Sequence, residues 1–255
     1  MATFIVSDFH GNLTAWNLLK NALKENDRVF VLGDACDRGP HGVEILLDIM
    51  NDPRFTYILG NHDDFMIRTL APQFISRGSM SFEAGWQTWK YNHGSATIKD
   101  MHSLKECCPR QYNDLVDWLV HQYVYCTVMS KGQKYHLAHA KFPKHLSKAC
   151  MTWRQMEQEY PKVLHSAVWD RYTSEENNLD SYITPGAMTI IGHTPVNRDN
   201  HVVCLGLINI DTGLGKNLEN PEVMVICLEN RNIYMLSQAF PGLPSVPTNS
   251  FIMAH

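Results

Sequence analysis

The chain has 255 residues, of which 44% are hydrophobic, and its formal net charge is -4. A chain of this size and composition can bury a sizeable core, and we expect one globular domain spanning residues 1–255. Acidic and basic residues are spread along the chain without a basic run, which argues against a nucleic-acid partner. No stretch approaches the roughly 18 consecutive apolar residues of a membrane span, so we expect no membrane partner.

The N-terminus and the cysteines indicate a compartment. Residues 1–7 begin directly with a strand-like run and lack the basic and apolar regions of a signal peptide. The seven cysteines are odd in number and follow neither a disulfide pattern nor a CxxC spacing. We therefore expect a reduced, cytoplasmic protein in which most cysteines are small core residues.

The first sixty residues alternate strand and helix patterns. Apolar residues at helical spacing predict helices over 13–23 and 43–50, and short apolar runs predict strands at 4–6, 29–32 and 55–59. This order predicts parallel strands covered by helices, because the crossover between parallel strands is usually a helix. Strands buried in this way have continuous apolar runs, as these do.

From about residue 66 to 122 the pattern changes to helical patches, such as 112–120, among polar residues. We expect a lobe of helices and loops over one edge of the sheet, with Trp86, Trp89 and Trp118 in its core. The remainder is rich in strands, which we predict at 123–129, 134–138, 188–191, 202–205, 207–210, 223–228 and 233–236. The residues 130–133 predict a hairpin turn, and three prolines predict an irregular tail over 241–255.

Polar motifs follow five of the predicted strands. In open α/β sheets, ligands bind beyond the carboxyl ends of the strands, so we expect the side chains of these motifs to meet in one crevice. The motifs are Asp8-Phe9-His10-Gly11-Asn12, Gly33-Asp34-Ala35-Cys36-Asp37-Arg38-Gly39, Gly60-Asn61-His62-Asp63, His139-Ala140-Lys141 and Gly192-His193-Thr194.

The ligand types in these motifs indicate metal chemistry. Imidazole suits zinc, iron and similar ions, while carboxylate and amide oxygens suit harder ions such as manganese, so the mixed set suits a pair of borderline metals. Two cations about 3.5–4 Å apart need a bridging anion, for which Asp34 is the central candidate. Asp8 and His10 stand at positions i and i+2, so on an extended strand both side chains would reach one ion.

The order DxHGN, GDxxDRG, GNHD, HAx and GHT resembles the calcineurin-like metallophosphoesterases, and within them the serine/threonine protein phosphatases in their bacterial and phage form. The motifs run from Asp8 to Asp211 and cover most of the chain. Five motifs in the family's order are far more specific than any one of them. The resemblance implies an α/β fold, a two-sheet β-sandwich flanked by helices in four α/β/β/α layers.

The resemblance also implies roles for single residues. A hydroxide bridging two divalent metal ions would attack phosphorus, and His62, oriented by Asp37, would protonate the leaving oxygen. Arg38 and Arg171 would clamp the phosphate, together with Asn61. One metal would be held by Asp8, His10 and Asp34, and the other by Asp34, Asn61, His139 and His193.

These roles predict a metal-dependent phosphatase that uses manganese, or else iron and zinc, and acts on a phosphorylated protein. One alternative is a symmetrical diadenosine tetraphosphate hydrolase, with the same metal centre and a small nucleotide substrate. Another is a non-catalytic binding module, which we would expect to have lost ligands, whereas this chain keeps all six and His62. A nuclease is disfavoured, because such relatives generally lack the Arg-Gly pair that stands here as Arg38-Gly39.

Four further positions carry expectations of their own. Lys141 stands where many members of the family have a small residue, and it would meet substrate charge or point to solvent. Residues 89–94 resemble a W-x-x-N-G-G segment of bacterial relatives near the substrate mouth, with His93 in place of the first glycine. We interpret Asp211 as structural support at a strand end, and Asp63 as a cap for the helix that follows it.

Overall fold

The computed structural model describes residues 1–76, 82–171, 179–196, 206–216, 218–238 and 249–250. The predicted strand at 202–205 and most of the predicted tail lie outside these ranges. Within them, the strands are β1 (Thr3–Val6), β2 (Arg28–Leu32), β3 (Phe55–Ile58), β4 (Tyr123–Ser130), β5 (Gln133–Ala138), β6 (Cys150–Thr152), β7 (Ala187–Ile191), β8 (Leu207–Asn209), β9 (Val223–Cys227), β10 (Asn232–Leu236) and β11 (Asn249–Ser250).

These strands form one mixed sheet with the order β11-β10-β9-β1-β2-β3-β4-β5-β7-β8, and β6 pairs with β4. β1, β2 and β3 are parallel neighbours, as predicted, and β5 and β7 are also parallel. The two halves of the sheet meet at β3 and β4, where Ile58 pairs with Tyr123.

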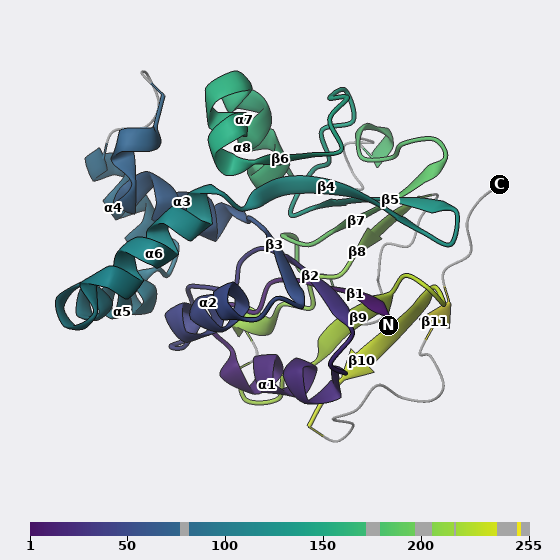
Figure 1. Cartoon of the computed structure of the whole chain (residues 1–255), viewed down its shortest axis with the longest axis horizontal. Coiled ribbons are helices and arrows are strands. Elements are labelled where there is room, and N and C mark those ends of the chain that lie inside the picture. Colours follow the sequence, from purple (N-terminus) through teal and green to yellow (C-terminus); the bar gives the residue numbers. More distant parts are fainter. Residues whose placement is uncertain (77–81, 172–178, 197–205, 217, 239–248, 251–255) are drawn as a thin grey trace.

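The two halves of the sheet share a core. One buried cluster contains Ile5 and Ile226 from the first half together with Leu137 and Ile190 from the second. The sheet therefore curls until its halves pack face to face, with helices on the outside (Figure 1). This arrangement confirms the expected α/β fold, with the two layers of the sandwich formed by one continuous sheet.

Helices cover the outer faces of the sheet and build the lobe. α1 (Leu13–Ala22) and α2 (Gly42–Asn51) are the crossovers after β1 and β2, and α3 (Asn61–Leu70) follows β3. The lobe consists of α4 (Phe82–Tyr91), α5 (Ser95–Cys107) and α6 (Pro109–Val120), which lie beyond α3 at the left of Figure 1. α7 (Trp153–Glu159) and α8 (Pro161–Trp169), which the sequence did not predict, pack against β4 and β6. Short 3-10 turns span Pro72–Phe74, Leu179–Ser181 and Leu214–Lys216.

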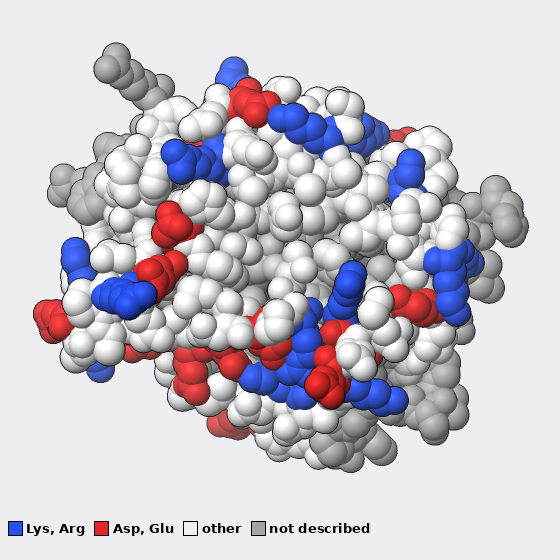
Figure 2. All heavy atoms as spheres, viewed as in Figure 1, with Lys and Arg blue, Asp and Glu red and all other residues white. Residues whose placement is uncertain are grey.

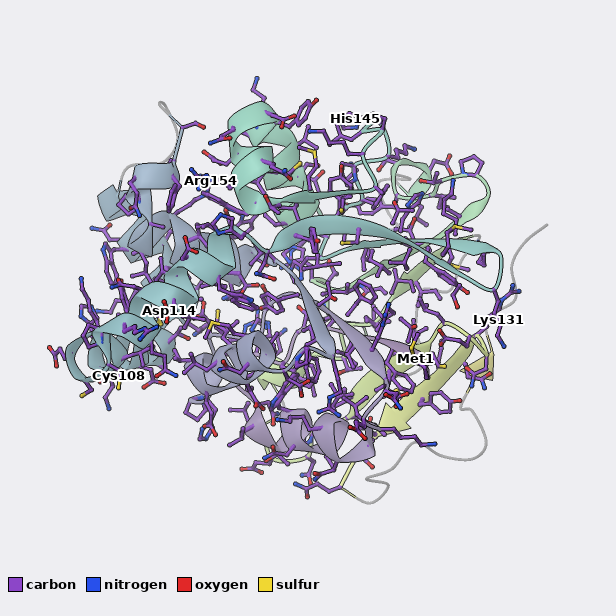
Figure 3. The ribbon with its side chains drawn as sticks, viewed as in Figure 1. Met1, Cys108, Asp114, Lys131, His145 and Arg154 are labelled. Atoms are coloured by element: carbon purple, nitrogen blue, oxygen red, sulfur yellow. The ribbon has the colours of Figure 1, made fainter. Side chains whose placement is uncertain are left out.

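The strand boundaries agree closely with those expected from the apolar runs. The predicted hairpin is a two-residue turn between β4 and β5, with positive φ at Lys131 (44°) and Gly132 (79°), as a tight hairpin requires. Figure 3 shows Lys131 at the tip of this hairpin, at the opposite end of the molecule from Cys108, which joins α5 to α6.

Charged side chains of both signs are interspersed around the rim of the face drawn in Figure 2, whose centre is largely uncharged. Among the described helices, none combines the length and apolarity needed to cross a bilayer.

Candidate metal centre

Five strand ends bring polar side chains to one buried place in the sandwich. β1, β2 and β3 lie side by side and parallel, so their carboxyl ends share one edge, and the curl of the sheet brings the ends of β5 and β7 to the same place. The six side chains expected as ligands all lie there and are all buried, namely Asp8, His10, Asp34, Asn61, His139 and His193.

The backbone reaches this place through left-handed turns. φ is 57° at Asp8, 46° at His10, 53° at Asp34 and 67° at His193, a conformation that costs a non-glycine residue roughly 1–3 kcal/mol. Neighbouring loops hold it, because the Asp8 N–H donates to the Gly33 carbonyl (3.1 Å) and the His10 N–H to the Asp34 carbonyl (2.8 Å). The expectation that Asp8 and His10 share a face of an extended strand is wrong, since β1 ends before both residues.

The first group of ligands lies on one side of Asp34. The Asp34 Oδ2 atom is 3.6 Å from His10 Nε2, which is 3.9 Å from Asp8 Oδ1. Among the described residues, His10 Nε2 and Asp8 Oδ1 have no hydrogen-bond partner although both are buried. Buried polar atoms without partners are costly, and a cation held between these two atoms would satisfy both.

The second group lies on the other side of the same carboxylate. The Asp34 Oδ2 atom is 3.5 Å from His139 Nε2. His139 Nε2 in turn lies 3.1 Å from Asn61 Oδ1 and 3.2 Å from His193 Nδ1. One carboxylate oxygen thus faces both groups, which is the placement that a bridging ligand needs.

Three histidines of the centre have one ring nitrogen held by a backbone carbonyl and the other turned toward Asp34 or its neighbours. The pairs are His10 Nδ1 with the Cys36 carbonyl (3.0 Å), His139 Nδ1 with the Leu32 carbonyl (2.7 Å) and His193 Nε2 with the Trp169 carbonyl (3.1 Å). Burial is the main reason why the pKa of each is lowered, and that of His193 falls to about 2. Neutral imidazoles oriented in this way present a lone pair inward, so the donor set fits two divalent ions.

The central carboxylates are in unequal environments. Burial alone would raise the pKa of Asp34, but the surrounding histidines, His139 above all, hold it below its usual range. Burial, together with the charges of Asp211 and Asp34, raises the pKa of Asp8 well above its usual range. The repulsion between these carboxylates is a cost that a bound cation would relieve.

Two further carboxylates, expected as a helix cap and as structural support, lie against the centre. Asp211 is buried at the end of β8, and burial raises its pKa to about 6. Asp63 lies in the first turn of α3 and not before the helix, where it accepts the N–H of the N-cap residue Gly60 (2.8 Å) in a capping box, and it also accepts the N–H of Asp34 (3.0 Å). The strand-end position of Asp211 and the motif position of Asp63 were the available signals, but neither shows which backbone groups these side chains contact.

His62 and Asp37 form a buried pair beside the first group. His62 Nδ1 is 2.7 Å from Asp37 Oδ2, and His62 Nε2 faces Asp34 Oδ2 at 3.9 Å. Burial disfavours the charged imidazole, but the charge of Asp34 and the hydrogen bond with Asp37 outweigh it and raise the pKa of His62. The pair can therefore hold a proton on the Nε2 side, as a general acid must.

Two arginines reach the rim of the centre. Arg38 is half-buried, and a Cβ on Gly215 would stand 2.6 Å from its Cδ and 2.9 Å from His10 Cβ, so a side chain at Gly215 would displace Arg38 or His10. Arg171 is exposed, and its Nη1 donates to the His193 carbonyl at 3.2 Å. Both guanidinium groups act to lower the pKa of Asp211, so both lie close enough to the centre to act on this carboxylate.

Lys141, for which two roles were open, pairs with a protein carboxylate. Its Nζ is 3.2 Å from Asp170 Oδ2 and 5.1 Å from the centre of the Tyr182 ring. The ammonium is only partly exposed, so its charge is largely engaged within the protein.

Gly60 is expected to be required for metal binding, because its missing side chain leaves room for Asp34. A Cβ at this position would stand 2.1 Å from Asp34 Oδ1, while φ of −100° is open to alanine. We expect Gly60→Ala to displace the carboxylate and to lower metal content and turnover by at least about tenfold.

Gly85→Ala in α4 is the matched control for Gly60→Ala. The nearest atom to its Cβ would be Thr69 Oγ1 at 3.4 Å, and alanine stabilises a helix interior by about 1 kcal/mol relative to glycine. Elemental analysis and an assay on p-nitrophenyl phosphate compare the two variants, and equal metal content in both would contradict the role of Gly60.

Known proteins share this architecture. The family model of the calcineurin-like phosphoesterases matches residues 1–202. A cold-active protein-tyrosine phosphatase of the psychrophile Shewanella sp. superposes with a TM-score of 0.56 at 14% identity, over 92% of this chain and 77% of that one. A protein assigned as a diadenosine tetraphosphatase gives 0.53 at 12% identity, over 92% and 93%.

A protein serine/threonine phosphatase from Saccharomyces cerevisiae gives a TM-score of 0.50 at 12% identity, over 98% of this chain and 81% of that one. No curated protein matches by sequence. At these identities the structural likeness establishes the fold, whereas the family model covers most of the chain and spans the five motifs from Asp8 to Thr194.

Proposed function

Because the chain belongs to the calcineurin-like phosphoesterase family and is thus a metal-dependent phosphoesterase, we propose that it hydrolyses phosphate monoesters as a serine/threonine protein phosphatase. The observation that carries the proposal is the position of Asp34, whose carboxylate faces two groups of buried ligands. The acid pair of His62 and Asp37 lies directly beside it.

The six buried ligands suit two divalent ions, with manganese as the first choice and iron or zinc as further candidates. Bound there, the ions would activate water and neutralise charge on the phosphoryl oxygens. We assign Asp8, His10 and Asp34 to one ion and Asp34, Asn61, His139 and His193 to the other.

The chain's own side chains would bind the phosphate and supply the proton. Arg38 and Arg171 are proposed to grip the phosphoryl oxygens, each with a planar fork of donors, and the Asn61 amide to help orient them. His62, whose Nδ1 is engaged by Asp37, would give its Nε2 proton to the leaving oxygen. The phosphoryl group would pass directly to water without a phosphoenzyme.

A substrate panel on the purified chain tests this proposal. With manganese present, we expect turnover of a phosphoserine peptide and of p-nitrophenyl phosphate, with release of inorganic phosphate. If no turnover is seen with manganese, iron, zinc, nickel or cobalt, each tested separately, the assignment as an enzyme is wrong and a binding module on the same fold is favoured.

A symmetrical diadenosine tetraphosphate hydrolase is the second candidate. The likeness to a protein assigned as a diadenosine tetraphosphatase, with nearly complete coverage of both chains, supports including it. The values of kcat/KM for diadenosine tetraphosphate and for the phosphopeptide distinguish the two candidates, because the metal centre would be the same and the residues around it would select the substrate. A preference for the dinucleotide by a factor of a hundred or so, equivalent to about 3 kcal/mol, would reassign the substrate.

A further inference from the structure

The lobe contacts the acid pair through one tryptophan. Trp89 lies on α4, is fully buried, and donates its indole Nε1–H to Asp37 Oδ2 at 2.8 Å. The same oxygen is 2.7 Å from His62 Nδ1. Asp37 Oδ2 therefore receives two hydrogen bonds, one from the histidine of the acid pair and one from the lobe.

The indole restricts the rotation of the Asp37 carboxylate. The other oxygen, Oδ1, is buried and has no hydrogen-bond partner among the residues that the structure describes. His62 alone would leave the carboxylate free to turn about its last bond, because one contact defines a distance and not an orientation. The donor from Trp89 supplies the second contact, and it holds Oδ2 against the imidazole.

The same stretch of the lobe also holds the backbone on which Asp37 and Arg38 stand. The Asp37 N–H donates to Thr97 Oγ1 at 2.9 Å, and the Arg38 N–H donates to the His93 carbonyl at 3.1 Å. Asp37 and Arg38 are both left-handed, with φ of 67° and 64°, so this turn needs external support to persist. Residues 89–97 thus contact the acid's partner and the first phosphate clamp at three points.

The packing of the indole depends on Gly94. A Cβ at this position would stand 2.4 Å from Trp89 Cδ1 and 2.5 Å from its Nε1. The backbone of Gly94, with φ of −76° and ψ of 0°, is open to any residue, so glycine is required here by the close approach of Trp89, both its indole and its backbone carbonyl, which would lie 2.8 Å from the Cβ. Within the segment that resembles the bacterial W-x-x-N-G-G pattern, the tryptophan and the last glycine are therefore in direct contact.

We infer that Trp89 is a positioning residue for proton transfer, which acts through Asp37 to hold His62 toward the leaving group. The inference rests on the proposed function of His62. A buried tryptophan also needs a partner for its N–H in any protein core, so a purely structural role predicts the same hydrogen bond. The two roles differ in how removal of the bond affects good and poor leaving groups.

The test compares two substrates in Trp89→Phe with manganese bound. A phosphoserine peptide loses an alkoxide that needs a proton, whereas p-nitrophenyl phosphate loses a stable phenolate that does not. We expect kcat on the peptide to fall about tenfold, the order expected for one hydrogen bond to a charged group, and kcat on the nitrophenyl ester to change less than about twofold. Metal content should stay at the wild-type value.

Trp153→Phe is the matched control. Trp153 is also fully buried, and its Nε1 donates to the buried carboxylate of Asp64 at 2.7 Å, away from the acid pair. The Trp153→Phe variant loses the same kind of hydrogen bond, and it should keep the wild-type ratio of kcat on the peptide to kcat on the nitrophenyl ester. Gly94→Ala is a second route to the same effect, because it pushes the indole aside without deleting it, and it serves where Trp89→Phe does not fold.

Three outcomes are informative. If both rates fall by the same factor, or if neither rate falls, the positioning role of Trp89 is wrong, but the proposed phosphatase function is unaffected. A further loss of the peptide rate when Trp89→Phe is added to Asp37→Asn also overturns the positioning role, since a residue that acts through Asp37 has no effect once that carboxylate is gone. If the wild-type protein turns over neither substrate, the proposed function fails and the inference fails with it.

Discussion

Replacing Asp34 by asparagine is expected to abolish the binding of both metal ions and to lower turnover of p-nitrophenyl phosphate by about 10³-fold or more. Asparagine keeps the shape of the side chain, and its oxygen can still accept the His62 N–H that lies 3.0 Å from Asp34 Oδ1. The substitution removes the negative charge between the two ligand groups, and this charge is needed to offset the repulsion between two bound cations.

Thermal unfolding gives a readout of this change that does not depend on activity. Metal at a hundredfold excess over its Kd stabilises the native state by about 2.7 kcal/mol, which corresponds to a rise in Tm of about 5–10 °C for a chain of this size. We expect wild type to show this rise with manganese and Asp34→Asn to show none.

Asp48→Asn is the control for Asp34→Asn. Asp48 lies on α2, where it pairs with Lys20 at 2.7 Å outside the metal centre. This variant should retain the manganese-dependent rise in Tm and the wild-type turnover. If Asp34→Asn bound the full complement of metal, the bridging assignment would be wrong.

Replacing His62 by asparagine is expected to slow turnover of a phosphoserine peptide by about 10²–10⁴-fold. Asparagine has no proton to give to the leaving alkoxide, whereas the pKa of His62 is raised in the protein, which favours the protonated imidazole. The effect on p-nitrophenyl phosphate should be much smaller, because its leaving group departs without a proton.

Metal content separates this role from another that the geometry permits. His62 lies close enough to Asp34 and His10 to share an ion with them, so it is a possible ligand as well as an acid. We expect His62→Asn to retain both metals. If His62→Asn lost one ion, His62 would be a metal ligand. His136→Asn is the control for the loss of an imidazole elsewhere, because His136 is a buried histidine stacked on Phe142.

The apolar runs were sufficient to predict most of the sheet, because strands buried on both faces need little beyond continuous hydrophobicity. α7 and α8 escaped prediction although each carries a local signal. Thr152 and Gln155 form a capping box at the start of α7, and Pro161 occupies the first position of α8. β6 has three residues and pairs with β4 through a register shift, so its existence depends on the neighbouring strand.

The candidate ligands could be selected from the sequence because their residue types, their order and their positions after strands are all local properties. How they converge is not local. Asp8 and His10 adopt left-handed turns because loops from the neighbouring strand accept their N–H groups, and no rule about extended strands would predict this. The contacts that Asp63 and Asp211 make with backbone and charges on other segments could not be predicted for the same reason.

Trp89 shows the limit most clearly. A buried tryptophan in an amphipathic helix has the same local pattern whether its N–H is bonded to a core carbonyl or to the acid's partner 52 residues away. The amino-acid sequence by itself determined most of the strands, the family and the residue types of the candidate ligands, because hydrophobic periodicity and ligand chemistry are local properties of the sequence. Only the tertiary structure decided which oxygen of Asp34 faces both groups, which nitrogen each histidine presents, and what holds Asp37, because those depend on hydrogen bonds between segments distant along the chain.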